Sequence, residues 1–418
     1  AYNTHSYHTK IPPKAIVPYI LHYTKPGDLI FDGFCGSGMT GLAVKICENP
    51  DNDFKKKIES ETSGFKWGTR NFILNDISPV ATLISYNLNQ EINTKMLEEN
   101  FNNIRNNLMI KTKWMYETTI NKDTEVESRN SKTKLDYVVW SDIFYCPNCL
   151  CEFDLWSTII SETNNNIKNL IVCPNCKINL KKNELNRVFE TSLNISKQTI
   201  KSVKQKIVKI YYSFINKNHK IKQNKQMVEF DSDLIKKIDR IIPENWFPQN
   251  SIPDGHNTRQ PKRSHNISHI EDFYTKRNLL ILSILKDEID QITNKNLRLY
   301  FYSIFTSFNP SLVSKLTRYN FGRRGSGPLT GTLYVPSYQV ERNVIDIFEK
   351  KTLDFLKNNS KERTETRSII TCQSASNLSN ISDNTIDYIF TDPPFGSNLM
   401  YSELNFIWES WLKVFTNN

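Results

Sequence analysis

The sequence has no long apolar run. No stretch approaches the roughly 18 consecutive apolar residues that a membrane-spanning helix needs. The first ten residues, AYNTHSYHTK, lack the apolar centre of a signal peptide. Internal repeats and long low-complexity tracts are also absent from the sequence. These absences exclude the membrane-spanning and repeat classes, and we expect a cytoplasmic protein with no membrane partner.

Acidic residues are fewer than basic residues. The chain has 44 Asp and Glu against 54 Lys and Arg, which gives a formal net charge of +10. A surplus of cations attracts phosphate groups without dictating a fold, so the charge favours a polyanionic partner. The length of 418 residues allows two or three domains, and a hydrophobic content of 38% is compatible with packed cores.

Cysteines are sparse outside one short segment. Five of the eight lie between residues 146 and 176, where CPNC occurs twice with the spacing C-x2-C-x23-C-x2-C. Two such knuckles predict a zinc ribbon at about residues 140–180, and four thiolates would make the metal structural. The expected ligands are Cys146, Cys149, Cys173 and Cys176. Cys151 is a spare thiol in this interpretation, and the alternative is that it replaces Cys149.

Short apolar segments alternate with helical ones at both ends of the chain. Strands are predicted at 29–31, 71–74, 368–373 and 386–390, with helices from about residue 38 and over 80–87. This order predicts a parallel, doubly wound α/β sheet. The sheet is formed by residues 1–95 and 366–418. Residues 96–365 are too long for a loop and form an inserted region, largely helical, with helices predicted over 200–214 and 276–292.

A glycine-rich loop follows the first strand. FDGFCGSGMTG (31–41) lets the backbone turn sharply close to a ligand, and the next helix offers free N–H groups. The Lys-Ser/Thr pair of a phosphate-binding P-loop is missing, which leaves a dinucleotide, a phosphate or S-adenosylmethionine as ligands. Asp76, which ends the second strand, is placed to accept hydrogen bonds from ribose hydroxyls. The alternative is that Asp76 caps the following helix.

The stretch TDPPFG (391–396) follows the last strand. Its two prolines remove two N–H donors, so Asp392 and the neighbouring carbonyls present mainly acceptors. Such acceptors suit a substrate that donates hydrogen bonds, such as the exocyclic amine of a base, while Phe395 stacks on the ring. A base in a duplex reaches such a site only by flipping out. The alternative is a simple turn in which the aspartate caps a helix.

These segments together resemble a known family. FDGFCGSGMTG, NDISP (75–79) and TDPPFG are similar to motifs I, II and IV of the amino-methylating DNA methyltransferases, and YHTKIPPKAIVPYILHYTKPGD (7–28) is similar to their motif X. The resemblance implies a Rossmann-like class I methyltransferase sheet and S-adenosylmethionine as cofactor. It also implies methylation of adenine N6 or cytosine N4 in duplex DNA with a flipped target base.

The resemblance also implies roles for individual residues. The catalytic residues would be Asp392, Pro393, Pro394 and Phe395. The cofactor would be held by Thr9, Lys10, Asp32, Phe34, Gly36, Gly38 and Asp76. An aspartate at the first position of the catalytic motif favours adenine over cytosine N4. Methylation at carbon 5 of cytosine is disfavoured, because the Pro-Cys pair that supplies its thiolate is absent.

Two departures from the family pattern stand out. Gly33 replaces a proline that is common in motif I, and few residues follow Phe395 although the sheet of the family has further strands. We therefore expect further sequence or a second polypeptide to complete the sheet, and a cognate restriction endonuclease is a further expected partner. The remaining functional alternatives are an RNA methyltransferase of the tRNA guanine-N2 type and a non-catalytic DNA-binding subunit.

Overall fold

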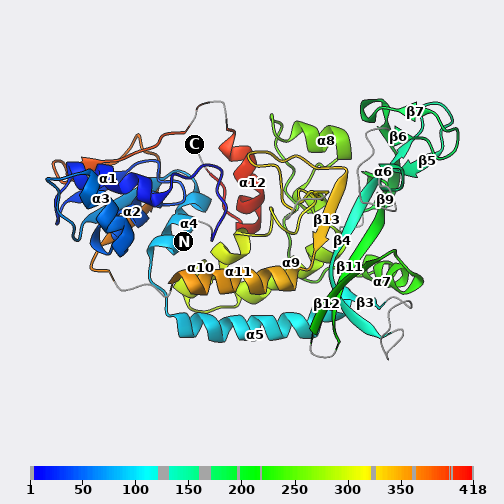
Figure 1. The fold of residues 1–418 in the computed structure, drawn as a ribbon, viewed down its shortest axis with the longest axis horizontal. Helices are drawn as coiled ribbons and strands as arrows, with labels where there is room; N and C mark the ends of the chain where they lie inside the picture. The colour runs from blue at the N-terminus through cyan, green and yellow to red at the C-terminus, as the bar shows by residue number, and fades with distance from the viewer. Residues whose placement is uncertain are drawn as a thin grey trace. The chain divides into compact units, whose positions relative to one another are not determined.

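The chain forms two compact units in the computed structural model (Figure 1). One unit, called here the sheet unit, consists of residues 1–101, 292–307 and 351–418. The other, called here the insertion unit, consists of residues 102–291 and 308–350. The structure describes residues 4–120, 131–159, 171–194, 198–216, 219–321, 326–359, 364–394, 396 and 399–416.

The sheet unit contains four parallel strands in the order β14-β2-β1-β15. They are β1 (Leu29–Asp32), β2 (Asn71–Asp76), β14 (Ser368–Cys372) and β15 (Tyr388–Ile389). The strands predicted from the apolar segments are therefore present. The helices of this unit are α1 (Pro13–Tyr23), α2 (Met39–Glu48), α3 (Asn52–Glu61), α4 (Pro79–Asn89), α10 (Lys295–Thr306) and α12 (Tyr401–Leu412). Two of the four boundaries between the units fall within α5 (Thr94–Thr112) and α11 (Val344–Asn359), and the other two flank α10.

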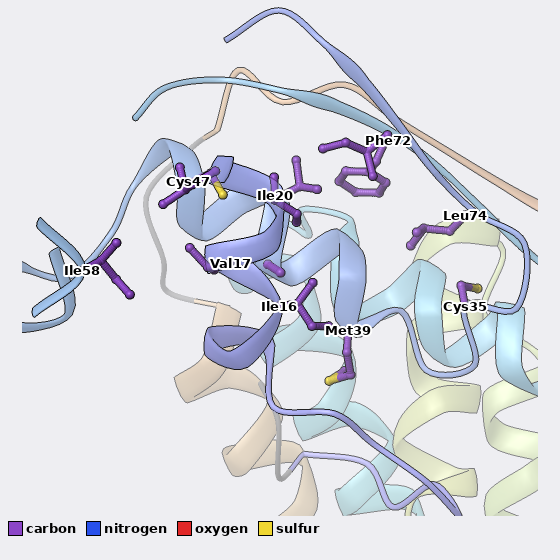
Figure 2. Packing of buried hydrophobic residues seen from close by; sticks show 13 residues of the cluster. Ile16, Val17, Ile20, Cys35, Met39, Cys47, Ile58, Phe72 and Leu74 are labelled. Carbon is purple, nitrogen blue, oxygen red and sulfur yellow. The ribbon is translucent and has the colours of Figure 1, made fainter. Parts of the chain in front are cut away.

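Helices α1 and α2 bury one face of this sheet. Ile16, Val17 and Ile20 of α1 lie in one cluster with Phe72 and Leu74 of β2 (Figure 2). All five are almost fully buried, so this cluster contributes hydrophobic stabilisation to the unit. Residues that point the other way at the two sheet edges are open to solvent, since Ile369 is 57% exposed and Ile389 is 60% exposed.

The insertion unit is built around long antiparallel strands. β4 (Lys132–Tyr145) pairs with β11 (Gln205–Asn216) on one side and β13 (Tyr338–Arg342) on the other, and β12 (His219–Lys225) pairs with β11. The shorter strands are β3 (Glu117–Thr119), β5 (Glu152–Asp154), β6 (Ile171–Val172), β7 (Asn179–Leu180), β8 (Asn186–Arg187), β9 (Phe189–Leu193) and β10 (Thr199–Val203). The expected largely helical insertion is therefore corrected to a mixed one.

The helix predicted over 200–214 is wrong, because these residues form β10 and β11. The register of β11 against β4 shifts between Ile207 and Lys209. This bulge places buried Ile207 and Ile210 three residues apart, a spacing that imitates a helical stripe. The other predicted helix, over 276–292, is confirmed as α9 (Lys276–Asp290).

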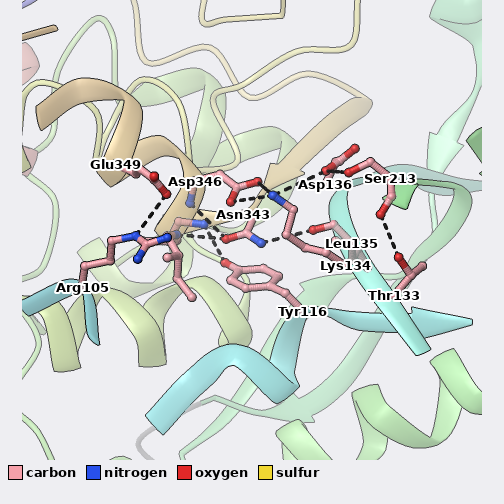
Figure 3. Close-up of polar contacts among 12 residues, drawn as sticks. Arg105, Tyr116, Thr133, Lys134, Leu135, Asp136, Ser213, Asn343, Asp346 and Glu349 are labelled. Atoms are coloured by element: carbon pink, nitrogen blue, oxygen red, sulfur yellow. Dashed lines mark hydrogen bonds and ion pairs between the residues drawn. The ribbon is translucent and has the colours of Figure 1, made fainter. Parts of the chain in front are cut away.

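The remaining helices of the insertion unit are α6 (Leu155–Ile159), α7 (Glu229–Asp239) and α8 (Arg259–His265), with single 3-10 turns at Lys113–Tyr116, Lys182–Glu184 and Ile270–Phe273. The start of α11 is fastened to β4 by Asn343, whose amide donates to the Leu135 carbonyl over 3.2 Å (Figure 3). Within the described residues no helix is long and apolar enough to cross a membrane.

Candidate functional site

Asp32 lies where β1 meets the glycine loop. Its carboxylate accepts hydrogen bonds from the Thr40 hydroxyl over 2.5 Å and from the Phe34 amide over 3.1 Å. The side chain is only 3% exposed, and burial raises its pKa to about 6. Asp32 therefore ties the end of the strand to the first turn of α2 and keeps the loop between them closed.

Asp76 joins the glycine loop to the start of α4. One carboxylate oxygen accepts from the Gly36 amide over 2.9 Å, and the other accepts from the Ser78 amide over 2.9 Å. The cap of α4 is Ser78, whose hydroxyl accepts from the Ala81 amide, so Asp76 is not the capping residue itself. Burial raises its pKa. Each carboxylate oxygen keeps a second lone pair with which it can accept a ligand hydroxyl.

Gly38 needs to be glycine for two reasons. It has a φ of +78°, and a Cβ atom there would lie 2.4 Å from the Ser85 hydroxyl and 2.6 Å from the Asn89 amide nitrogen. The first turn of α2 thus packs closely against α4. This contact fixes the direction of the α2 N-terminus relative to the loop.

The N-terminal segment and α12 form the opposite wall of the site. The Thr9 hydroxyl and the Tyr401 hydroxyl are 3.0 Å apart, and His8 Nε2 is 3.0 Å from the Asn405 side-chain oxygen. Lys10 donates to the His5 carbonyl, and burial lowers the pKa of its amine to about 8. The segment His8–Thr9 is therefore held against α12 by these side-chain contacts.

A cavity of about 390 Å³ lies between these walls. This volume is within the range of about 300–1,000 Å³ that is usual for small-molecule sites. It brings together most of the residues predicted for the cofactor and for catalysis, namely Thr9, Lys10, Asp32, Phe34, Gly36, Asp76, Asp392 and Pro394. Gly38 and Pro393 are described but do not line the cavity, and Phe395 lies outside the described residues.

Asp392 reaches the cavity from the loop after β15. The last strand residues are held to β1 by a bond from the Phe390 amide to the Phe31 carbonyl over 3.0 Å. The segment Thr391–Pro394 that follows is exposed. Asp76 and Asp392 thus lie at the carboxyl ends of β2 and β15, the two parallel strands that flank β1, and ligands bind at this edge of such a sheet.

Several residues that line the cavity were not predicted as site residues, although Tyr7 lies in the segment similar to motif X. Tyr7, Met400, Tyr401 and Asn405 all line the cavity. The rings of Tyr7 and Trp408 are stacked with centroids 6.5 Å apart, and Asn405 donates to the Ser78 hydroxyl over 3.2 Å. The only sequence signal for α12 was its apolar and aromatic periodicity, which does not indicate a ligand.

The residues of the cavity fit a cofactor with a hydroxyl-bearing nucleoside. The Ser37 hydroxyl in the glycine loop is 2% exposed and has no hydrogen-bond partner among the described residues. Buried polar atoms are normally paired, so this hydroxyl fits a polar group of a ligand. The buried carboxylate of Asp76 offers further acceptor sites, and Ile11, Ile16 and Met39 supply apolar surface for a ring.

The cysteine cluster is a second candidate site, in the insertion unit. The sulfur atoms of Cys146, Cys149, Cys173 and Cys176 all lie within 4.8 Å of one another. The distances are 3.7 Å between Cys146 and Cys176 and 3.6 Å between Cys149 and Cys173. Zinc–sulfur bonds of about 2.3 Å in a tetrahedron place sulfurs roughly 3.8 Å apart, so the four thiols are compatible with zinc.

The two knuckles have the same backbone geometry. Leu150 and Lys177 both have positive φ, and their amides donate to the carbonyls of Cys146 and Cys173. Cys151 in the first knuckle corresponds to Ile178 in the second, because the amides of Cys146 and Cys173 donate to the carbonyls of these two residues. Cys151 therefore lies outside the repeated pattern, although its sulfur is 3.3 Å from that of Cys173.

Comparisons with known proteins point to one family. Residues 1–50 match a family model described as DNA methylase, of the N6 and N4 methyltransferase type. No curated protein and no solved structure matches the chain. The matched segment contains Thr9, Lys10 and the whole glycine loop, which form one side of the cavity. The resemblance inferred from the motifs is thus confirmed in this segment: residues 1–50 of the chain are similar in sequence to the amino-methylating DNA methyltransferase family.

Proposed function

We propose that the chain is an S-adenosylmethionine-dependent DNA methyltransferase that modifies an exocyclic base amine, with N6 of adenine in a specific duplex sequence as the target. The observation that carries the proposal is the cavity shared by Asp32, Asp76 and Asp392. It joins the segment that matches the DNA methylase family to the acceptor-rich loop after β15.

The strand order supports a Rossmann-like class I methyltransferase sheet, since parallel strands β2 and β15 flank β1 and the glycine loop follows β1. Residues 1–95 and 366–418 would form this catalytic part. Residues 96–365 would form an inserted region for DNA recognition, stabilised by zinc on Cys146, Cys149, Cys173 and Cys176. Helix α10 lies within residues 96–365 but belongs to the sheet unit, so it would support the catalytic part.

The bound cofactor would supply a methyl group on a sulfonium centre. Asp76 would accept hydrogen bonds from its ribose, while the glycine loop from Phe34 to Gly38 leaves room for it beside Thr9 and Lys10. The apolar side chains Ile11 and Met39 would exclude water from this part of the cavity.

Asp392 would act on the target base. In adenine the amino lone pair is delocalised into the ring, which makes the nitrogen a poor nucleophile. Acceptance of its N–H bonds by the Asp392 carboxylate and a neighbouring carbonyl favours a pyramidal nitrogen with a directed lone pair. Pro393 and Pro394 keep competing N–H donors out of the loop, and Phe395 would stack on the flipped base. After the transfer the proton leaves to Asp392 or to solvent.

A transfer assay tests the activity. Protein incubated with unmethylated duplex DNA and cofactor labelled in its methyl group should label the DNA, and analysis of the digested nucleosides should find N6-methyladenine. Detection of N4-methylcytosine would instead identify cytosine as the target base. Label only in tRNA would favour the guanine-N2 alternative, and DNA binding without label would favour a non-catalytic subunit.

Substitution of Asp392 tests the site. Asp392→Ala should lower the rate of transfer on the order of 10²–10³-fold, since one stabilising contact to the reacting group is lost. Binding of the cofactor, measured by calorimetry, should change little. The control is Asp383→Ala, which removes another exposed acid of the same C-terminal segment. Equal rates in Asp392→Ala and Asp383→Ala would reject the proposed role.

A further inference from the structure

The sheet of the insertion unit carries a row of aromatic and basic side chains. In the strand register Arg342 of β13 is paired with Tyr137 of β4, and Tyr137 is paired with Tyr211 of β11. Paired residues of an antiparallel sheet point to the same face, so these three side chains are neighbours. The rings of Tyr137 and Tyr211 are stacked with centroids 4.3 Å apart, and the hydroxyls of Tyr211 and Tyr319 are 2.9 Å apart.

This row forms part of the wall of a second cavity, of about 510 Å³. The same cavity is lined by Lys220 and Lys222 from the neighbouring strand β12. Both lysines are exposed, and neither has an ion pair with any other residue that the structure describes. The two ammonium groups are therefore available to an anionic ligand.

The acids beside this cavity are already engaged (Figure 3). The Lys134 amine lies 2.7 Å from the Asp346 carboxylate and 4.0 Å from that of Asp136. Asp136 also accepts a hydrogen bond from the Ser213 hydroxyl over 2.9 Å. Lys134 and Arg342 together balance the charges of the two acids, so the two lysines of β12 determine the net attraction of the cavity.

The tyrosines remain neutral and able to donate. Burial raises the pKa of Tyr137 to about 12, and burial raises the pKa of Tyr211 further above its ordinary value. Neutral phenols do not repel an anion. Their rings offer the flat, half-buried surface on which bases stack in proteins that bind single strands.

We propose that this cavity of the insertion unit binds one unstacked nucleotide of the DNA strand, with its base on the aromatic wall of Tyr137 and Tyr211 and its phosphate at Lys220 and Lys222. The inference rests on the proposed DNA methyltransferase function for the identity of the strand. A nucleotide fits better than an acidic peptide, because every nucleotide presents a planar ring beside a phosphate, whereas a peptide does so only where an aromatic residue neighbours an acid. A stacked base makes this contact tolerant of sequence, so the cavity adds affinity more than it adds specificity.

Removal of the two lysines is the first test. The full chain is titrated, without cofactor, into a fluorescein-labelled duplex with a single-stranded extension, and anisotropy is recorded at several salt concentrations. Lys220→Ala with Lys222→Ala should weaken binding about tenfold or more and should reduce the steepness of log affinity against log salt by about one, because the two lysines share one phosphate. The control is Lys56→Ala with Lys236→Ala, which removes two exposed lysines elsewhere and should leave binding unchanged. An unchanged affinity and slope in the cavity pair would overturn the proposal.

Substitution of Tyr211 separates stacking from charge. Tyr211→Phe keeps the ring and should keep most of the affinity, whereas Tyr211→Ala should weaken binding about tenfold, as expected for the loss of one stacked base. Circular dichroism checks that Tyr211→Ala is folded, and if it is not, the exposed lysine pair still decides the outcome. Equal affinity of Tyr211→Ala and wild type would reject the aromatic wall.

The identity of the strand is tested with RNA of the same sequence. Tighter binding of the RNA, lost in the same variants, would overturn DNA as the occupant. The binding assay needs no methyl transfer. If the wild type transfers no methyl group but the double lysine variant binds DNA more weakly than the wild type, only the proposed activity is refuted. If the wild type transfers methyl groups but the double lysine variant binds DNA as tightly as the wild type, only this inference is refuted.

Discussion

At the scale of single residues, buried Asp32 makes stability depend on pH. Its pKa of about 6 in the folded chain is above the ordinary value of 3.8. The folded state therefore holds this proton more tightly than the unfolded chain, and the contribution of Asp32 to stability falls as the pH rises from about 4 to 6. Asp32→Asn removes this dependence and keeps one oxygen that can accept from the Phe34 amide, while the Thr40 hydroxyl can turn to accept from the new NH2 group.

The prediction concerns the difference in unfolding free energy between Asp32→Asn and the wild type. From pH 4 to pH 7 the variant should become more stable relative to the wild type by about 3 kcal/mol or less, as the shift in the pKa of Asp32 implies. Thermal unfolding of both proteins without cofactor at the two pH values measures it. A difference that stays constant with pH would show that Asp32 is not the titrating group.

Two glycines give a second prediction at this scale. Gly38 and Gly64 both have positive φ, but an added Cβ meets Ser85 and Asn89 at Gly38 and nothing within 4 Å at Gly64. Gly64→Ala should cost about 1–2 kcal/mol from the backbone alone. Gly38→Ala should cost clearly more, because α4 must move away from α2. Thermal unfolding measures the midpoints of both variants. Equal midpoints would mean that α2 and α4 accommodate the added methyl group at no extra cost, against the prediction.

The residues of the site could be predicted only where their role is local. Asp76 and the glycine loop follow their own strands in the sequence, so the turn itself reveals them. Tyr401 and Asn405 were not predictable, because they lie in α12 and reach the cavity only after the sheet unit has folded around the N-terminal segment. No local pattern in the sequence records such a long-range approach.

At the scale of elements, β11 shows how a local irregularity misleads a periodic pattern. The residues from Gln205 to Asn216 are rich in β-branched and aromatic side chains, which favour a strand. The bulge at Ile207 shifts the buried face by one residue and produces the spacing of a helix. The short parallel strands β1 and β2 were predicted correctly, because they are continuously apolar and end at recognisable turns.

The zinc knuckles carry the prediction at this scale. Purified protein should contain about one zinc per chain, and Cys173→Ser should lose the metal and destabilise the small cluster around Phe144 and Leu180. Cys151→Ser is the matched control, since Cys151 lies within 3.4 Å of ligand sulfurs but outside the repeated knuckle pattern, and it should keep the metal. Loss of zinc in Cys151→Ser together with its retention in Cys149→Ser would reverse the assignment of the two residues.

At the scale of the whole molecule, the net charge of +10 predicts how binding responds to salt. Each phosphate that a lysine or arginine neutralises releases a counterion, so affinity for duplex DNA should fall more than about tenfold between 50 and 200 mM salt. Affinity for S-adenosylmethionine should change far less, because the small cavity of the sheet unit would hold it through hydrogen bonds and apolar contacts, without a comparable array of phosphate contacts. Fluorescence anisotropy for DNA and calorimetry for the cofactor, each repeated across this range, measure the two slopes. A DNA affinity that does not depend on salt would mean that the excess of lysine and arginine takes no part in binding the substrate.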